Sequence, residues 1–383
     1  MQTHTAYFDN AATTFPKPEC VYTAMDEFAR SCGVSLGRGQ HRMTAKASHL
    51  AEETETLLLS LFHCTNKKVV LTNTATEALN IVLRGINIPD GGKVYVSPFE
   101  HNAVTRTLHY LQTIKNFEVK QLVVDSEEYE YDLDAISEQF KSEPPCCVII
   151  SHASNVIGAV APIDETFRLA KMYDAVTVAD MCQTAGLIDT DISSNDYDFV
   201  IFAGHKTLYG PLGVSGFIST SPEKLSPIIY GGTGIESANQ DMPAESPERF
   251  QAGSHNTIAI AGLNASLKWL LDIGIDNIHK REQENVAQLI SILDQYDNVR
   301  VFKPKNRVGV VSCTFDGYTS DEIGQVLSDR DIAFRSGLHC APLAHKFIGT
   351  FPAGTIRFSV GYFNNDEDFQ MLDETLRYIY NNA

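Results

Sequence analysis

The stretch DFVIFAGHK (198–206) decides the fold, because it joins a continuous apolar run to a basic side chain. A run without polar alternation is typical of a strand that is buried on both faces of a parallel sheet. Such a strand would deliver Lys206 at its carboxyl end, which is where ligands bind in open α/β sheets. A lysine that loses its proton in a desolvated site can form a Schiff base with a carbonyl compound. The alternative is a surface lysine just beyond a strand.

Similar apolar runs lie on both sides of this stretch. They are VVLT (69–72), KVYVSP (93–98), VKQLVV (119–124), CCVIIS (146–151), AVTVAD (175–180) and GVSGFIS (213–219). Segments with a helical pattern separate most of them, including TATEALNIVLRGI (74–86) and APIDETFRLAKMYD (161–174). This alternation predicts an α/β protein with a mostly parallel central sheet that is covered by helices on both faces.

The last third of the chain has a different pattern. Residues 230–254 are rich in turn formers and lack periodicity, which indicates a long functional loop. The expected elements beyond it are helices at 258–274, at 319–331 and over about the last seventeen residues, and strands at 308–315 and 355–360. We therefore expect a large domain over residues 15–262 and a small α+β domain built from residues 1–14 and 263–383.

Composition excludes several classes of protein. The 383 residues are 43% hydrophobic and 20% charged, as in ordinary globular proteins, and the net charge is −18. Such a charge repels phosphate backbones, so we expect no nucleic-acid partner. The sequence has no apolar run of eighteen residues and no signal-peptide pattern at its start, so we expect no membrane span and a place in the cytosol. None of the eight cysteines has CxxC or zinc-site spacing, so we expect no metal.

Two further strand ends carry groups that suit a planar cofactor. Asp180 ends the run AVTVAD, and Gln183 follows three residues later. A carboxylate in this position can keep the pyridinium nitrogen of pyridoxal 5′-phosphate (PLP) protonated, although an Asp that caps the next segment is the alternative. His101, in SPFEHNAV (97–104), could stack on a ring or serve a purely structural role.

The stretch LTNTATEALN (71–80) leads from a strand into a helix. The free backbone N–H groups of Ala75 and Thr76, together with the positive helix end, suit a phosphate. The alternative is an ordinary helix cap with Glu77 in the first turn.

A reactive thiol is the last candidate group. The stretch FRSGLHCAP (334–342) places Cys340 between basic residues, Arg335 and His339, in a loop that contains Gly337. Nearby cations favour the thiolate, which is the reactive form of cysteine. A packed, inert cysteine is the alternative.

In combination, these motifs resemble the cysteine desulfurases and selenocysteine lyases of the class V aminotransferase group. The resemblance extends from YFDNAATTFPKP (7–18) to IRFSVGYFNNDEDF (356–369). Its most specific pieces are DNAATT (9–14), EHNA (100–103), SNVIG (154–158), DMCQ (180–183), GHK (204–206), FQAGSHNT (250–257) and RSGLHCA (335–341). It implies the large PLP-dependent aspartate-aminotransferase-type fold, with a mostly parallel sheet in a large domain plus a small α+β domain.

The resemblance also implies roles for single residues. Lys206 is similar to the lysine that carries PLP, Asp180 to its pyridinium partner, Gln183 to the donor to the ring 3-oxygen, and His101 to the ring-stacking histidine. Contacts to the cofactor are implied for Asn155, which would also face the substrate, and contacts to its phosphate for Ala75, Thr76, His205 and Ser254. The Ser254 contact would cross the interface of a homodimer.

Arg357 resembles the arginine that holds the substrate carboxylate, and Cys340 resembles the cysteine that receives sulfur. The implied reaction converts L-cysteine to L-alanine and leaves a persulfide on Cys340 for a sulfur-acceptor protein. L-selenocysteine lyase activity, another PLP reaction such as transamination, epimerisation or C–S lysis, and a catalytically silent scaffold stay open as alternatives.

The chain departs from many relatives in two places. Ala203 stands where they have a serine before Gly-His-Lys, so one phosphate contact would be missing. The segment from Cys340 to TIRFS (355–359) is short, as in the subgroup whose cysteine sits on a constrained loop and depends on a partner to remove the sulfur.

Overall fold

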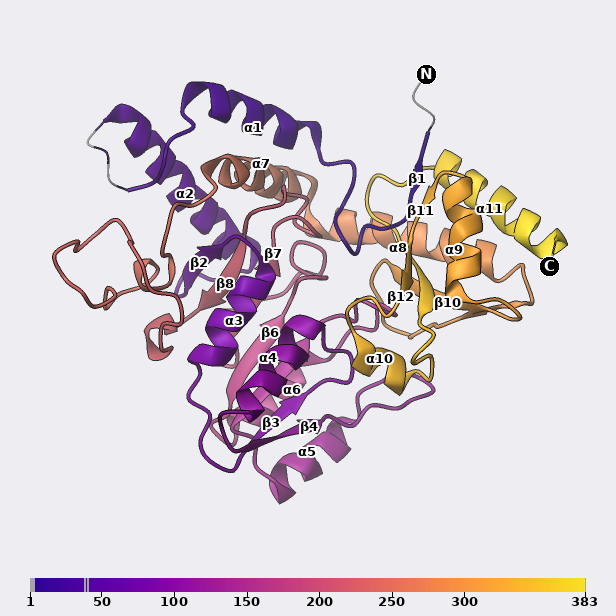
Figure 1. The fold of residues 1–383 in the computed structure, drawn as a ribbon, viewed down its shortest axis with the longest axis horizontal. Coiled ribbons are helices and arrows are strands. Elements are labelled where there is room, and N and C mark those ends of the chain that lie inside the picture. The colour runs from indigo at the N-terminus through magenta and orange to yellow at the C-terminus, as the bar shows by residue number, and fades with distance from the viewer. Residues whose placement is uncertain (1–3, 38, 40, 383) are drawn as a thin grey trace.

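The computed structural model describes residues 4–37, 39 and 41–382, and a seven-stranded sheet forms its largest core (Figure 1). The strands are β2 (Lys68–Thr72), β3 (Gly92–Val96), β4 (Phe117–Gln121), β5 (Cys147–Ser151), β6 (Val176–Asp180), β7 (Phe199–Ala203) and β8 (Ser215–Ser219). Their order is β2-β8-β7-β6-β5-β3-β4, and β8 runs antiparallel to both of its neighbours while the other pairs are parallel. Each of the seven apolar runs overlaps a strand, so the mostly parallel sheet is confirmed.

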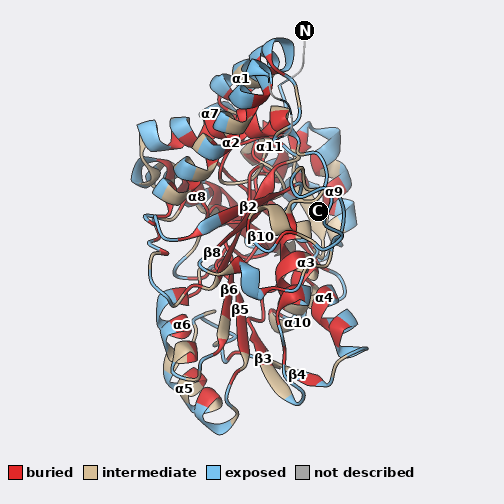
Figure 2. Ribbon diagram, turned by 90° about the vertical axis from the view of Figure 1, so that its left-hand side faces the viewer, coloured by how far each residue is buried: buried red, intermediate tan, exposed pale blue. Residues whose placement is uncertain are grey.

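Helices cover both faces of this sheet. Successive side chains of a strand point to opposite faces, and in most of these strands the side chains on both faces are apolar. In β5, Val148 and Ile150 pack into one core and Cys147 and Ile149 into another. The first core receives α2 (Arg42–Leu61), α5 (Leu133–Ser142), α6 (Ile163–Lys171) and α7 (Thr257–Ile273), and the second receives α3 (Ala75–Gly85) and α4 (Asn102–Gln112). Helix α1 (Glu19–Ser31) packs on α7. Figure 2 shows the buried strands enclosed by helices whose outer faces are exposed.

A second, smaller sheet has its own core. Its strands are β9 (Val299–Val301), β10 (Val310–Phe315), β12 (Arg335–Gly337) and β13 (Thr355–Ser359), in the antiparallel order β12-β13-β10-β9. The helices of this part are α8 (Ile275–Leu293), α9 (Ser320–Asp329), α10 (Pro342–Phe347) and α11 (Asp366–Asn381). The strands and helices expected beyond residue 254 are thus confirmed.

The beginning of the chain joins this smaller part. Strand β1 (Ala6–Tyr7) pairs in parallel with β11 (Ile332–Ala333), and Asp9 bridges to Ser359. At the end of the DNAATT motif the Thr14 N–H donates to the His205 carbonyl oxygen at 3.2 Å, just beyond β7. The motif therefore lies at the junction between the smaller part and the large sheet.

The predicted domain boundary at 262/263 falls inside α7, and α7 packs on α1 and α2. The division into two domains stays a prediction. The backbone turns at Gly274, where φ is +87° and the axes of α7 and α8 meet at 85°. No single helix among the described residues is long and apolar enough to cross a membrane, and α7 with α8 meets that criterion only as this bent pair.

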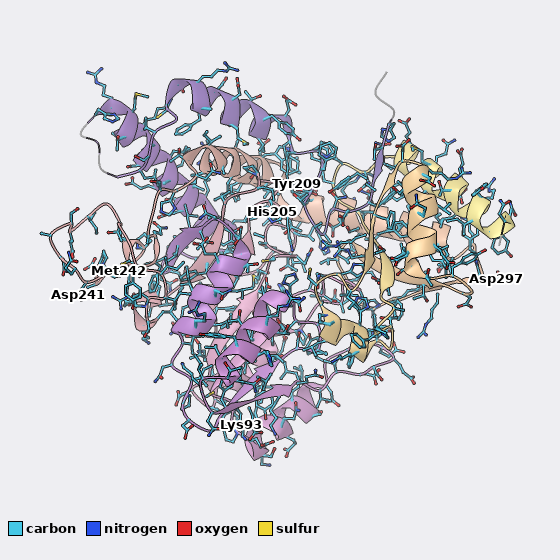
Figure 3. The ribbon with its side chains drawn as sticks, in the orientation of Figure 1. Lys93, His205, Tyr209, Asp241, Met242 and Asp297 are labelled. Carbon is cyan, nitrogen blue, oxygen red and sulfur yellow. The ribbon has the colours of Figure 1, made fainter. Side chains whose placement is uncertain are left out.

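The loop over residues 230–254, all of which are described, contains one helical turn, the 3-10 helix η2 (Glu248–Phe250). A second 3-10 helix, η1 (Pro222–Lys224), precedes it. The loop projects from the side of the large sheet, and Figure 3 labels Asp241 and Met242 at its outer edge.

Candidate active site

A cavity of about 290 Å³ lies where the carboxyl ends of the large sheet face the smaller sheet. This volume is near the lower end of the range of small-molecule sites, which is about 300–1,000 Å³. Its wall contains Ala75, Thr76, His101, Asn155, Asp180, Gln183, Ala203, His205, Lys206, Arg335, His339, Cys340 and Arg357. All predicted site residues except Ser254 therefore meet in one place, and Figure 3 labels His205 near the centre of the molecule.

Lys206 reaches the cavity from the turn that follows β7. Its N–H donates to the Ala203 carbonyl oxygen at 3.3 Å, and its carbonyl oxygen accepts from the Tyr209 N–H at 2.8 Å. The turn passes close to the next strand: a Cβ on Gly204 would lie 2.4 Å from the Val214 carbonyl oxygen. A glycine before His-Lys is thus required for the tight approach that places the lysine.

Lys17 supports this turn from behind. Its Nζ donates to the His205 carbonyl oxygen at 2.7 Å and to Thr14 Oγ1 at 2.6 Å. Burial lowers the pKa of Lys17 to about 7. The DNAATTFPKP segment therefore fixes the main chain beside Lys206.

Asp180 and Gln183 lie at the end of β6. Asp180 is buried, and its Oδ1 accepts from the Cys182 N–H at 3.0 Å. Its second oxygen has no hydrogen-bond partner among the described residues, so it is available to a ligand. Gln183 Nε2 donates to the Ala11 carbonyl oxygen at 3.0 Å.

His101 is a neutral ring that caps α4. Its Nδ1 accepts from the Ala103 N–H at 3.0 Å, so in the neutral ring the proton resides on Nε2. Burial, with a further contribution from the charge of Lys206, lowers the pKa of His101 to about 4. A neutral, flat side chain suits a stacking position above a planar group.

The amino end of α3 forms a cradle for an anion. Thr74 is the cap residue, and its side chain accepts from the Glu77 N–H at 3.1 Å. The N–H groups of Ala75 and Thr76 have no acceptor among the described residues and lie at the positive helix end. His205 Nδ1 is buried without a partner, and burial lowers the pKa of this ring to about 4. An uncompensated buried polar atom indicates a missing hydrogen-bonding group.

Arg357 lies on β13, is 1% exposed and is held on two sides. Its Nη2 donates to Asp9 Oδ1 at 2.7 Å, and its Nη1 donates to the Asn155 carbonyl oxygen at 2.9 Å. Its Nε is buried without a partner. Arg335 pairs directly opposite on β12 and also lines the cavity, so two guanidinium groups lie side by side there.

The loop that carries Cys340 has an unusual backbone. Gly337, His339 and Cys340 all have positive φ, at +92°, +47° and +57°. Two hydrogen bonds hold the loop: the Asn102 N–H donates to the Cys340 carbonyl oxygen at 2.7 Å, and Asn155 Nδ2 donates to the His339 carbonyl oxygen at 2.7 Å. The surroundings thus hold Cys340 in a conformation that non-glycine residues seldom adopt.

The thiol is exposed to the cavity and has one basic neighbour. Arg335 Nη2 lies 3.7 Å from Cys340 Sγ. His339 does not act as a second cation, because burial and the charge of Arg357 lower its pKa to about 2. Its Nε2 lies 2.9 Å from Thr355 Oγ1. The expectation of two flanking cations is therefore wrong for His339, whereas Arg335 does contact the sulfur and its effect on the thiol stays a prediction.

The model of the family described as "Aminotransferase class-V" matches residues 6–372 of this chain. The chain belongs to the class-V aminotransferase family. A probable cysteine desulfurase of Methanothermobacter thermautotrophicus is 29% identical, covering 97% of this chain and 94% of its own. Probable cysteine desulfurase 2 of Mycobacterium leprae is 34% identical, covering 96% of this chain and 90% of its own.

A solved cysteine desulfurase of Thermococcus onnurineus superimposes with a TM-score of 0.90 at 28% identity, covering 99% of this chain and 95% of its own. The aspartate-aminotransferase-type fold expected from the motifs is confirmed, as is the resemblance to this group.

Ser254 is the one predicted site residue that this class-V aminotransferase chain does not bring to the cavity. It lines a separate hollow of about 640 Å³ beside α2, together with Glu55 and Gly232. Its predicted contact with a phosphate needs a second subunit and stays a prediction.

Two residues of this class-V aminotransferase site were not identified from the sequence. Asp9 holds Arg357, although the two are 348 positions apart. Glu100 is fully buried beside His101 and accepts from Ser97 Oγ at 2.6 Å and from Ser151 Oγ at 2.8 Å. Burial raises its pKa to about 7. Its signals in the sequence were its charge at a strand end and its place as the first residue of the EHNA motif (100–103).

Proposed function

We propose that the protein is a PLP-dependent cysteine desulfurase, which converts L-cysteine to L-alanine and leaves a persulfide on Cys340. One observation carries the proposal: an exposed thiol on the loop after β12 lines the same cavity as Lys206 at the end of β7. Transamination and epimerisation would need the lysine but not a thiol opposite it.

The cavity fits PLP by its unsatisfied groups. The free N–H groups of α3 and the unpartnered His205 Nδ1 suit the phosphate, and Asp180 suits the pyridinium nitrogen. Lys206 would hold the aldehyde carbon, and His101 would cover one face of the ring. When bound, PLP supplies an electron sink for the carbon that loses its proton.

The chain's own residues would then act on the substrate. The carboxylate of L-cysteine would lie against Arg357 Nε and Arg335, while Asp9 and the Asn155 carbonyl oxygen keep Arg357 from turning away. The Lys206 amine would take the proton from Cα and return a proton to carbon. Asn155 Oδ1, which is buried without a partner, would orient the bound amino acid.

Cys340 would carry out the sulfur transfer. Its thiolate, beside Arg335, attacks the substrate sulfur, so that a sulfur–sulfur bond forms as the carbon–sulfur bond breaks. The electron pair of the broken bond stays on the carbon skeleton, which takes up a proton and leaves as alanine. The reaction is balanced: L-cysteine and the Cys340 thiol give L-alanine and the Cys340 persulfide.

We further propose a homodimer in which Ser254 of one subunit contacts the phosphate in the other, and a sulfur-acceptor protein that empties Cys340. A cytosolic location is supported by eight cysteines that are all free, which is typical of a reducing compartment.

The test is Cys340→Ser, with Cys20→Ser as the matched control because Cys20 is the other exposed cysteine. Alanine release from L-cysteine should fall by about 100-fold or more in Cys340→Ser, as expected on removal of a nucleophile, and remain unchanged in Cys20→Ser. PLP should still bind, and alkylation should trap no persulfide in Cys340→Ser.

Release of alanine from L-selenocysteine would partly survive this change, because selenium can leave without attack by a thiolate. If Cys340→Ser released alanine from L-cysteine as fast as the wild type, the protein would be a general lyase. A wild-type protein that bound PLP but turned over neither amino acid would be a silent scaffold.

A further inference from the structure

A groove starts at Cys340 and leads away from the cavity between α3 and α4. It has a volume of about 570 Å³. Its lining comprises Thr76, Asn80, Arg84, His101, Asn102, Ala103, Arg106, Thr107, Tyr110 and Cys340. Thr76, His101, Ala103 and Cys340 line both hollows, so the groove is continuous with the candidate active site.

The groove is basic although the protein as a whole carries a net charge of −18. Arg84 and Arg106 are exposed in it, and the lining contains no Asp or Glu. Among the described residues, neither arginine forms an ion pair. Arg335, at the inner end of the groove, contacts the Cys340 sulfur. Three guanidinium groups thus follow the route by which sulfur on Cys340 is reached from outside.

The length and composition of the groove suit a peptide segment. Its walls extend from Thr76 to Arg84 and from Asn102 to Tyr110. Each wall is a stretch of nine residues and has about 12 Å of helical rise. An extended chain of roughly four residues has this length. At the outer end, the Arg84 guanidinium lies 5.7 Å from the Tyr110 ring, which is 48% exposed. Arginine and tyrosine are the side chains that most often anchor protein–protein interfaces.

We propose that this groove docks an acidic segment of a sulfur-acceptor protein, with the acceptor thiol placed beside Cys340. The proposal rests on the proposed function, because it needs a persulfide on Cys340. The acceptor thiolate attacks the outer sulfur, a new sulfur–sulfur bond forms on the acceptor, and Cys340 leaves as a thiolate. No external oxidant or reductant is consumed.

Charge favours a transient partner over a second copy of this chain. Each turnover has to free Cys340 again, so the occupant must enter and leave. Exposed charges at an interface chiefly speed association and select the partner, and they add little to the lifetime of a complex. A second copy that faced this groove with its own groove would oppose arginine to arginine, whereas an acidic segment complements the two arginines.

Two synthetic peptides test the proposal on the PLP-loaded protein. Each has six residues with one central cysteine, flanked by aspartates in the first and by lysines in the second. The protein is charged with L-cysteine, excess substrate is removed, and loss of the Cys340 persulfide is followed by alkylation and mass spectrometry. We expect the acidic peptide to accept sulfur about tenfold faster than the basic one, with a preference that fades at 0.5 M salt, roughly three times the physiological ionic strength.

The double variant Arg84→Glu, Arg106→Glu should reverse the preference between the peptides. Single variants separate the two charges, because the charge of Arg106 also acts on His101, whereas Arg84 lies over the ring of Tyr110 at the outer end of the groove. The matched control is Arg168→Glu, an exposed arginine on α6, which packs into the core on the opposite face of the sheet. With dithiothreitol as the acceptor, Arg84→Glu should release alanine as the wild type does.

Three results would overturn the proposal. They are equal rates with both peptides in the wild type, an unchanged preference in the double variant, and a shift of the Arg84→Glu protein to monomers in sedimentation, which would show that a second copy covers the groove. A wild-type protein that forms no persulfide from L-cysteine would instead contradict the proposed function, so the two failures are distinguishable.

Discussion

The buried side chain of Glu282 lies between the smaller part of the molecule and the large sheet. The effect of its protonation on stability therefore tests how these two parts are joined. This side chain of α8 is 4% exposed, and its Oε1 accepts from the Gly309 N–H at 2.6 Å. Beside it lies a cavity of about 10 Å³, which is also lined by Gln183 and Thr207. This is just room for one water molecule, which needs roughly 10–15 Å³. Thr207 Oγ1 is buried without a partner, so a water there would link the residue after Lys206 to Glu282.

Burial raises the pKa of Glu282 from 4.5 to about 8. Between these values the folded protein keeps a proton that the unfolded chain has lost, so the free energy of unfolding falls as the pH rises. Each pH unit is worth about 1.4 kcal/mol, and the interval gives an upper bound of about 5 kcal/mol. Below pH 4.5 both states are protonated and the contribution is constant. Glu282→Gln keeps the acceptor for Gly309 and removes this dependence.

The assay is urea unfolding between pH 5 and 8.5, followed by the fluorescence of Trp269. This is the single tryptophan of the chain, and its ring lies 5.2 Å from that of Tyr209 and 5.8 Å from that of Phe363. We expect Glu282→Gln to exceed the wild type in stability by several kcal/mol at pH 8 and to approach it at pH 5. Glu284→Gln, an exposed glutamate of the same helix, is the control for loss of a negative charge. A difference that stays constant with pH, or that grows toward acid, would refute the reasoning.

Three further predictions concern the site. Lys206→Ala should abolish alanine formation and remove the borohydride-reducible link between PLP and the chain; a link that persists would mean that another lysine holds the cofactor. Heterodimers of a Lys206→Ala subunit with a Ser254→Asp subunit should regain part of the activity that each homodimer lacks, and no gain in heterodimers shown to form would contradict a shared site. Gly354→Ala should slow alanine formation while PLP stays bound, because its Cβ would lie 2.4 Å from the backbone of Gly337 in the loop that carries the thiol; Gly349→Ala, with similar φ but open space around it, should have the smaller effect.

The site residues at strand ends could be predicted from the sequence, because the carboxyl ends of parallel strands lie at the same edge of a sheet. Asp180 and Lys206 follow continuous apolar runs, and this pattern alone implies that their side chains meet. The Arg357–Asp9 pair could not be predicted, since nothing local relates residues 348 positions apart.

The protonation state of His339 could not be predicted either. Its place next to Cys340 indicated a cation, but tertiary packing buries the ring against Thr355 and keeps it neutral. Glu282 shows the same limit, because a glutamate on an amphipathic helix is normally exposed and only the approach of Gly309 explains its burial. Ser254 lies outside the cavity of one subunit, and a single chain cannot show what it meets.

The position of Asp9 has a consequence for the order in which the protein matures on the ribosome. The carboxylate leaves the exit tunnel early, yet its partner Arg357 is added 348 residues later, and the β11 strand that pairs with β1 is made only shortly before it. At translation rates of about 5–20 residues per second, roughly 20 to 70 seconds separate the two. The large sheet, complete by Ser219, can collapse in that interval with its cofactor cradle and lysine in place, while the first strand waits for its neighbours. The part of the cavity wall that contains Asp180 and Lys206 is therefore complete well before the part that contains Cys340 and Arg357 has been synthesised.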